Sequence, residues 1–391
     1  MATGNFEKDL TTGNVWKRLF LFSLPFLASN LVQSCFNLAD MIILGNFGGT
    51  NSLSGVSIGS GVMVILTTLA GGLSTGGTVL IGNYLGADQK HKINRVISTL
   101  FISLLAIGLF FSSVLLWKSK LLLTLLKAPA ESFDEAYKYL FICSIGLIFV
   151  FGYNALASIM RGLGDARTPM IFIILACLIN IILDIVLVAY VGMGATGAAL
   201  ATILSQALSM ISLIIYLKTR NFMFDFKPSS FVFSKKEFYL IIKTGLPISI
   251  QSVATNFSFL LLNSFISRLG GVNASAAVAV VMNFNGFAIL PSHAINMAAT
   301  SMISQNTGKG KLKRSHEVIT ACLVMCIVVS ALVFTIVHLI PHGIFALFGA
   351  EEAVILCGIP YLLAFSFEYV GLPFIVTYNA FLTGTGRGCS R

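Results

Sequence analysis

The sequence predicts an all-α protein that crosses a membrane many times and forms two related helix bundles. Of its 391 residues, 56% are hydrophobic and only 10% are charged, whereas soluble globular domains carry about 25% charged residues. The mean hydropathy is +0.90. So few ionisable side chains cannot cover a water-soluble protein of this length, and we infer that lipid surrounds most of its surface. The spans are helical because backbone polar groups in lipid must be satisfied within a segment.

Ten apolar spans follow one another along the chain, each long enough to cross a hydrocarbon core, for which a helix needs about 20 residues. They are residues 16–40, 54–82, 94–117, 136–160, 168–191, 195–217, 238–266, 275–304, 317–340 and 353–383. The first span is too long for a signal peptide and ends in an acid, Asp40. We therefore expect it to remain in the mature protein.

The basic residues are distributed very unequally between the two sides of the membrane. If the N-terminus is cytoplasmic, all but five of the 25 Lys and Arg residues fall in cytoplasmic segments. The exceptions are Lys118, Lys120, Lys127, Lys138 and Arg268. This asymmetry predicts a cytoplasmic-membrane protein with both termini in the cytoplasm. It also explains the formal net charge of +10 without nucleic-acid binding.

An internal repeat appears when the sequence is shifted against itself by 222 residues. The matching landmarks are Leu24-Pro25 with Leu246-Pro247, Gly48-Gly49 with Gly270-Gly271, Gly86 with Gly308, Tyr139 with Tyr361, and Gly162 and Gly164 with Gly384 and Gly386. A constant offset over so long a stretch indicates a duplicated unit.

The repeat divides the chain into an N-terminal six-helix lobe (1–217), a cytoplasmic linker (218–238) and a C-terminal lobe (239–391). An even number of spans in the first unit predicts two lobes in the same orientation, as parallel repeats around a central cavity. The chain stops at the equivalent of Pro169. We therefore expect ten transmembrane helices of an original twelve, with the last two missing; a natural ten-helix protein is the alternative.

Three acids lie within the predicted spans, namely Asp40, Asp184 and Glu368. An intramembrane acid is costly and marks a functional site by default. Polar residues accompany the first two at helical spacing: Gln33 and Asn37 before Asp40, Asn180 before Asp184, Thr202 with Gln206, and Tyr139 and Asn154 in the fourth span. We expect this set to form a coupling-ion or substrate site in the first lobe. The alternative is that the amides and hydroxyls only bond between helices, for about 0.6 kcal/mol each.

The second lobe is poorer in acids, since Leu262 stands at the position equivalent to Asp40. Its candidate cavity residues are Gln251, Thr255, Asn283, Asn285, His293, Asn296 and Glu368. Polar lining of the central cavity and bonding between helices are equally compatible with them.

Neither an enzyme nor a metal site is expected. The five His residues are scattered along the chain, at 91, 293, 316, 338 and 342. Cys322 and Cys326 share a helix face but have no nearby His or acid in the sequence to complete a metal site. We therefore predict a protein without a cofactor.

Several segments together resemble the multidrug and toxic-compound extrusion (MATE) family. They are LPFLASNLVQSCFNLADMIILGNFGG, IGNYLGADQ, NALASIMRGLGDARTP, NIILDIVLV, GATGAALATILSQ, ISQNTGKGK and NAFLTGTGRG. The resemblance implies two six-helix lobes and antiport of organic cations against protons or sodium ions. It further implies a coupling carboxylate at Asp40 and a hydrogen-bond network of Tyr139, Asn154, Asn180, Asp184 and Thr202.

One position departs from part of that family. The NorM-like branch has an acid in the seventh helix where this chain has Thr255, so the DinF-like or MepA-like branches fit better. The expected partners are small organic cations and the lipid bilayer, and the expected state is a monomer. Two further readings remain open: a flippase for anionic lipid-linked precursors, which predicts Lys or Arg inside several spans, and a non-functional fragment.

Overall fold

The computed structural model describes residues 6–386, without the side chains at positions 260, 263, 264, 267–270 and 272. Arg268, one of the basic residues discussed above, is therefore among the side chains that lie outside the description. The described part of the chain contains helices and no strand, as the sequence predicts.

The first half contains six long helices and two short π-helical turns. They are α1 (Val15–Ile43), η1 (Leu44–Gly48), α2 (Gly49–Gly86), α3 (Lys90–Leu125), α4 (Ala130–Gly162), α5 (Arg167–Asp184), η2 (Ile185–Tyr190) and α6 (Gly194–Thr219). The Asn14 side chain caps α1 by accepting a hydrogen bond from the Lys17 amide, as short polar residues do at helix N-termini. The π-helical turns were not predicted.

The second half begins after a short 3₁₀ turn, η3 (Pro228–Ser230). Its helices are α7 (Lys235–Ala288), α8 (Leu290–Gly308), α9 (Leu312–Leu339), α10 (Pro341–Leu347), α11 (Glu352–Phe365) and α12 (Glu368–Gly384). The range of α7 covers most of two predicted segments, and a kink at Gly271, whose φ and ψ are not helical, divides it into two helices. Pro291 stands in the first turn of α8, where its missing N–H costs no hydrogen bond.

The helices agree with the predicted spans. Seven described stretches are long and apolar enough to cross a membrane, and α11 with α12, bent by 41°, forms an eighth. The first of these, Val15–Gly86, is 72 residues long and contains both α1 and α2. The predicted span 238–266 lies in the first part of α7, where several side chains are undescribed.

The duplication is visible in the backbone. Residues with positive φ recur 222 positions apart, in four pairs: Gly49 with Gly271, Asp88 with Gly310, Lys127 with Gly349, and Gly164 with Gly386. A positive φ is rare outside glycine, and each pair occupies the equivalent turn between helices. The same turns thus connect the helices in both halves.

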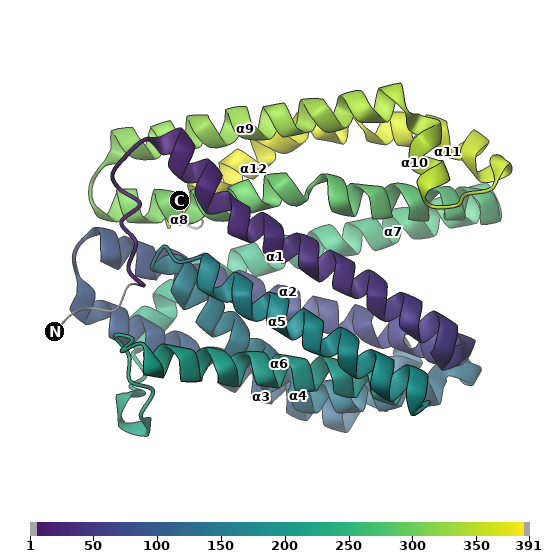
Figure 1. Cartoon of the computed structure of the whole chain (residues 1–391), viewed down its shortest axis with the longest axis horizontal. Helices are drawn as coiled ribbons and strands as arrows, with labels where there is room; N and C mark the ends of the chain where they lie inside the picture. The colour runs from purple at the N-terminus through teal and green to yellow at the C-terminus, as the bar shows by residue number, and fades with distance from the viewer. Residues whose placement is uncertain (1–5, 387–391) are drawn as a thin grey trace.

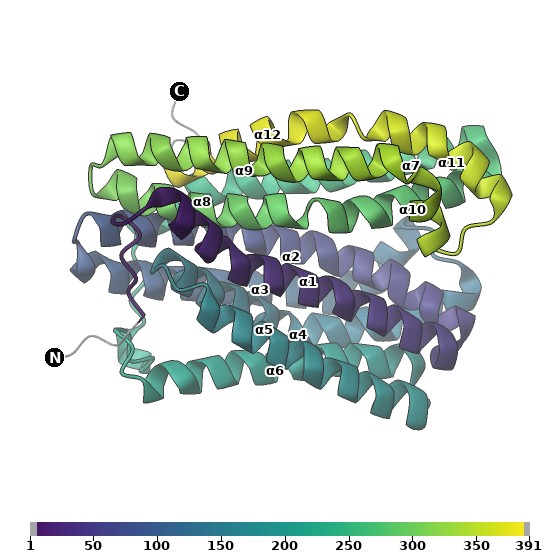
Figure 2. The same cartoon turned by 45° about the horizontal axis from the view of Figure 1, so that its top comes forward.

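Two lobes lie side by side with α1 running between them (Figures 1 and 2). α2 packs on α7 and α8 of the other lobe, and α1 packs on α5, α8 and α9. Glycines bring the two lobes into backbone contact: Gly86 faces the Gln305 carbonyl, and Gly308 faces the Asn83 carbonyl. Small residues allow such close helix packing in membranes.

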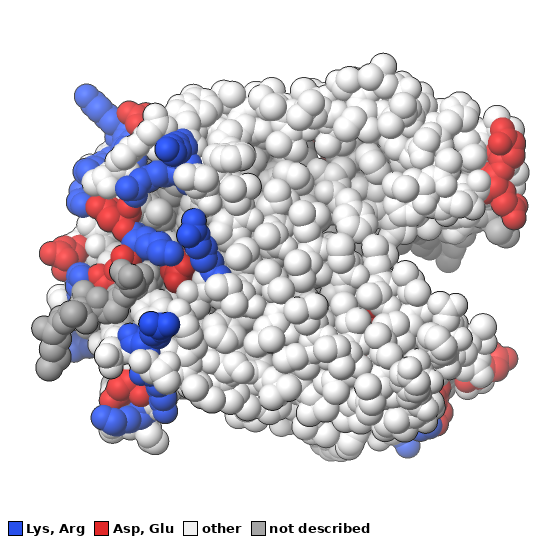
Figure 3. Space-filling view, in the orientation of Figure 1, with Lys and Arg blue, Asp and Glu red and all other residues white. Residues whose placement is uncertain are grey.

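Acidic groups lie at both ends of the molecule, whereas most of the Lys and Arg side chains visible in Figure 3 gather at one end. We call it the basic end; it carries the α2–α3, α4–α5, α6–α7 and α8–α9 connections. A notch between the lobes opens at the opposite end (Figure 3), which we call the open end. The glycine contacts between α2 and α8 therefore close the lobes against each other at the basic end.

The segment before α1 strengthens this closure. Lys8 donates to Asp165 of the first lobe at 2.9 Å, and the Leu10 amide donates to the Gln305 side chain of the second lobe at 3.0 Å. Residues 6–14 therefore tie the two lobes together at the basic end.

The loop between α6 and α7 is folded against the first lobe. Phe224 and Phe226 belong to the same buried apolar cluster as Phe101 of α3, and the Ser98 hydroxyl donates to the Val232 carbonyl at 2.9 Å. The segment proposed as a linker is thus held in place by apolar packing.

We predict that Gly86→Ala will separate the lobes at the basic end. A Cβ at this position would lie 2.0 Å from the Gln305 carbonyl oxygen, so the helices must move apart. Overpacking of this kind costs about 1–3 kcal/mol, which shifts the equilibrium toward a state closed at the open end. Electron–electron distance measurements between spin labels at Phe47→Cys and Leu347→Cys, both exposed, should then give shorter distances.

The control is Gly61→Ala in the same helix, where an added Cβ meets no atom within 4 Å. The exposed Cys35 and Cys357, and also Cys389, are replaced by serine in every variant. Identical distance distributions for the two alanine variants would show that the α2–α8 contact does not hold the lobes in this arrangement.

Candidate functional site: an acid pair beside two chambers

Asp40 lies in the last turns of α1, directly before the π-helical turn η1. Its helix places Gln33, Asn37 and Asp40 at i, i+4 and i+7, on one face. Asp184 is the last residue of α5 and directly precedes η2. η1 and η2 contact each other, so each acid lies within one turn of one of two paired π-helical turns. Such turns occur frequently at functional sites.

The two carboxyl groups are neighbours and interact electrostatically with each other. Asp184 is fully buried and Asp40 is half-buried. Neither Asp184 oxygen, nor Asp40 Oδ1, finds a hydrogen-bond donor among the described residues. Two carboxylates can only repel each other, whereas a carboxyl group can donate to a carboxylate. The pair is therefore arranged to share one proton or to hold one cation.

Asn180 and Tyr139 border the acid pair. Asn180 is buried one turn before Asp184, and neither its amide nitrogen nor its oxygen has a partner among the described residues. Tyr139 is 6% exposed and interacts electrostatically with both acids. Each unpaired buried polar group lowers the free energy of unfolding by about 1–3 kcal/mol. This cluster of unpaired atoms therefore destabilises the fold, as expected of a functional site.

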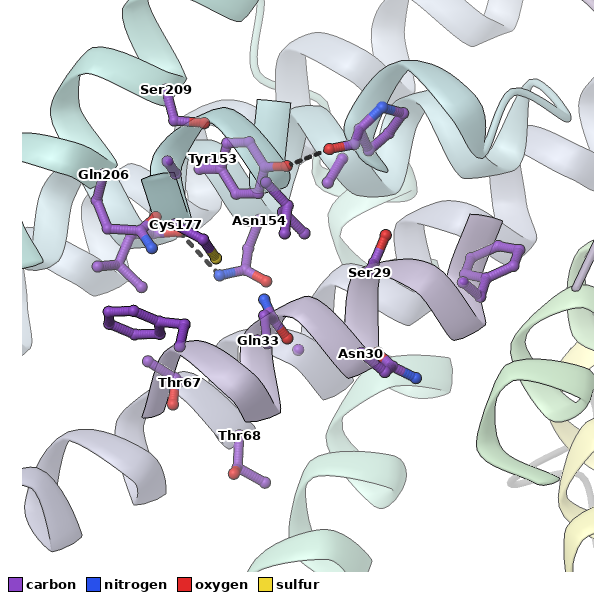
Figure 4. Close-up of a pocket in the computed structure, with 18 of the residues that line it drawn as sticks. Ser29, Asn30, Gln33, Thr67, Thr68, Tyr153, Asn154, Cys177, Gln206 and Ser209 are labelled. Carbon is purple, nitrogen blue, oxygen red and sulfur yellow. Dashed lines mark hydrogen bonds between the residues drawn. The ribbon is translucent and has the colours of Figure 1, made fainter. Parts of the chain in front are cut away.

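The first chamber has a volume of about 570 Å³. Six of the predicted site residues line it: Gln33, Asn37, Asn154, Asn180, Thr202 and Gln206. Gln33 of α1 and Asn154 of α4 point toward each other across it (Figure 4), and Asn154 also donates to the Val150 carbonyl at 2.9 Å. Asp40 and Asp184 lie just beyond this lining, one turn from Asn37 and Asn180. The chamber therefore reaches the acid pair through amide side chains.

The second chamber, of about 610 Å³, lies against the second lobe. Six of the seven predicted residues line it: Gln251, Thr255, Asn285, His293, Asn296 and Glu368. The prediction was wrong for Asn283, which lies outside both chambers and donates to the Ala279 carbonyl of its own helix. Asn285 accepts a hydrogen bond from the buried Tyr369 hydroxyl at 3.0 Å. Asn285, Ile289, His293 and Asn296 share one helical face, and Asn283 does not.

The two chambers adjoin, because Thr75, Arg161, Ile248, Ser252 and Met297 line both of them. Arg161 was placed in a cytoplasmic loop from the sequence, whereas the structure places it in the last turn of α4. Its spacing of seven residues from Asn154 would have indicated the same helix face. The flippase alternative predicted Lys or Arg in several spans, and Arg161 is the one such residue in these linings.

None of the described residues forms a group of three or more His, Cys, Asp or Glu side chains suited to a metal ion. The acid pair with Asn180 instead offers oxygen atoms alone, which suit a proton or a hard monovalent cation. This donor set does not distinguish the two ions.

Both halves of the chain are similar in sequence to known membrane transport proteins. The MatE family model matches residues 25–186 and 247–389, the two halves of the repeat. Probable multidrug resistance protein YpnP of Bacillus subtilis is 28% identical over 372 residues, which are 94% of this chain and 82% of that protein. Multidrug export protein MepA of Staphylococcus haemolyticus is 25% identical over 380 residues, or 96% and 83% of the two chains.

Solved structures share the fold. A MATE protein in complex with MaL6 superposes with a TM-score of 0.90 at 25% identity, covering 97% of this chain and 85% of that one. An outward-facing MATE family transporter of the MOP superfamily superposes with a TM-score of 0.92 at 24% identity, covering 99% and 86%. The two-lobe arrangement of this chain is therefore that of these transporters.

We predict an energetic coupling between Asp40 and Asp184. In a double-mutant cycle of Asp40→Asn, Asp184→Asn and the double variant, the unfolding free energies in detergent should be non-additive by about 1 kcal/mol, since contacting residues couple by roughly 0.5–3 kcal/mol. The control cycle combines Asp40→Asn with Glu131→Gln, an exposed acid in the first turn of α4. Additivity in both cycles would show that the acids do not interact.

Proposed function

The chain belongs to the MATE family of multi-pass membrane transporters, and from this premise we propose that it exports small organic cations in exchange for protons or sodium ions. The family is one of transporters and not of enzymes. The observation that carries the proposal is the buried, mutually facing pair of Asp40 and Asp184 beside the first chamber.

The acid pair supports exchange because it can satisfy one positive charge at a time. When the pair holds a coupling ion, its negative charge is neutralised and a cationic substrate loses its attraction to the chamber. When the pair is ionised, the chamber favours a cation. A proton would serve as the coupling ion because a protonated carboxyl group of one acid can donate a hydrogen bond to the carboxylate of the other; a sodium ion would instead be held by the oxygen atoms of both.

The lobes supply alternating access. We propose that residues 1–217 and 239–391 rock as two bodies joined by the 218–238 linker. By the positive-inside rule the basic end faces the cytoplasm, with both chain termini on that side of the cytoplasmic membrane. The notch in Figure 3 then opens outward, and the α2–α8 glycine contacts close the cytoplasmic end. We propose that the protein acts as a monomer and uses no cofactor.

The chambers suit flat organic molecules. Their volumes of about 570 and 610 Å³ lie in the range of roughly 300–1,000 Å³ that holds drug-sized ligands. Phe36 and Phe26 line the first chamber and Phe259 the second, next to amides and hydroxyls. Aromatic walls with a few polar groups would bind varied aromatic cations without demanding one shape.

The decisive experiment measures transport of the dye cation rhodamine 6G in proteoliposomes, under an imposed proton gradient and separately under a sodium gradient. We expect Asp40→Asn and Asp184→Asn each to lower the gradient-driven rate by about tenfold or more, which corresponds to about 1.4 kcal/mol. The gradient that drives the wild-type protein identifies the coupling ion.

Glu131→Gln removes an exposed acid far from the chambers and should transport the dye at the wild-type rate. If both acid variants transport as fast as the wild type with an unchanged dependence on the gradient, the coupling role of the pair is wrong. If neither gradient drives the wild-type protein, the antiport proposal itself is wrong.

A further inference from the structure

Arg161 stands at the junction of the two chambers. It lies in the last turn of α4, contributes to both linings, and is half-buried. Among the described residues it is the only Lys, Arg, Asp or Glu that lines the first chamber. In the second chamber the other such residue is Glu368, which begins α12 at the bend between α11 and α12.

The guanidinium of Arg161 has no anionic partner. No carboxylate within residues 6–386 forms an ion pair with it. A basic side chain near a helix C-terminus can have a structural role by donating hydrogen bonds to the last carbonyl groups of its helix. In α4, however, backbone amides already donate to these carbonyls: Leu163 to Ile159, and Gly164 to Arg161. A cation inside a membrane protein normally pairs with an acid or a carbonyl.

The surroundings combine hydroxyl groups with apolar walls. Ser252 of α7 and Thr75 of α2 lie in the lining shared with Arg161, together with Ile248 and Met297. Thr75 already donates to the Gly71 carbonyl at 2.9 Å, so its oxygen faces the chamber as an accepting group only. The guanidinium is therefore the strongest donor at this junction, and it is placed beside surfaces that suit an aromatic or aliphatic body.

We propose that Arg161 is an anion-binding subsite that takes the carboxylate of a zwitterionic aromatic substrate, whose cationic end points toward Glu368. A guanidinium binds a carboxylate through two parallel hydrogen bonds. The inference rests on the proposed transport function only in treating the chambers as the substrate path. What it adds is a residue that determines specificity for molecules that carry both charges.

This subsite is separate from the acid pair. Tyr139, which borders Asp40, and Arg161 lie 22 positions apart on the same continuous helix, or roughly 33 Å along its axis at about 1.5 Å per residue. A variant at Arg161 can therefore change substrate binding without touching the coupling site.

The experiment uses two dyes that differ in one group. Rhodamine 6G is a cationic ethyl ester, and rhodamine 19 is the corresponding free acid, a zwitterion at neutral pH. Binding of each dye is measured by fluorescence anisotropy in phosphatidylcholine nanodiscs, whose lipids carry no net charge. The variants are Arg161→Gln, Arg161→Lys and the control Arg167→Gln, which removes an exposed charge at the same end of the protein but lines neither chamber.

We expect Arg161→Gln to weaken rhodamine 19 binding by about tenfold or more, since a hydrogen bond to a charged group contributes about 1.5–3 kcal/mol. Its affinity for rhodamine 6G should stay within about twofold, and Arg161→Lys should lie between the two. Arg167→Gln should match the wild type with both dyes. Equal losses for the two dyes, or no loss for rhodamine 19, would overturn the proposal.

A second measurement needs no variant. Benzoate should displace rhodamine 19 from the wild-type protein and leave rhodamine 6G bound; displacement of neither dye or of both would count against the subsite. The transport assay above gives an independent outcome. If rhodamine 19 binds through Arg161 while no gradient drives rhodamine 6G, the antiport proposal fails and the subsite stands.

Discussion

An unpaired charge surrounded by apolar helices is costly in free energy. Unpaired charges are therefore few inside this structure, and they mark its candidate sites. The Lys and Arg side chains gather at one end of the bundle, and the lipid-facing surface is left almost free of charge (Figure 3). The exceptions inside are the pair of Asp40 and Asp184, the guanidinium of Arg161 and the carboxyl group of Glu368. Each borders a chamber, so the fold accepts the cost of burial where a small molecule or an ion can offset it.

At the basic end, the two lobes are held together by the close approach of two helix backbones. At Gly86 and Gly308 the helices α2 and α8 come so close that a methyl group would overlap a carbonyl oxygen. Contacts of this kind need no side-chain ordering, so the lobes can meet and part with little change inside either one. The N-terminal segment adds polar bonds across the same end, between Leu10 and Gln305 for example. Leu10 and Gln305 are both buried in this arrangement, so parting of the lobes must expose them to water.

Much of the fold follows from periodicity and composition. The offset of 222 residues identified Gly49 and Gly271 as equivalent, and both have the positive φ that a turn between helices requires. The helix faces through Gln33 and through Asn180 were also predictable, because polar residues at i, i+4 must avoid lipid. The contact between Asp40 and Asp184 was not predictable from either helix alone, since it depends on how α1 crosses α5. The π-helical turns leave no composition signal, and Arg161 was assigned to the loop because the predicted span 136–160 ends one residue before it, whereas α4 continues to Gly162.

The position of Arg161 has a consequence for alternating access. α4 and α2 belong to the first lobe, and α7 and α8, which complete the junction of the chambers, belong to the second. In the rocking proposed above, parting of the lobes at the basic end would take Arg161 away from Ser252 and Met297, with which it shares both chamber linings, and bring it into contact with the water that enters there. Its guanidinium is then hydrated and accessible to an anionic group from that side, whereas in the arrangement described here it faces the chamber. In the proposed rocking, the acid pair and the guanidinium are thus exposed to opposite sides of the membrane, so the coupling site and the anion subsite are open to water in different states.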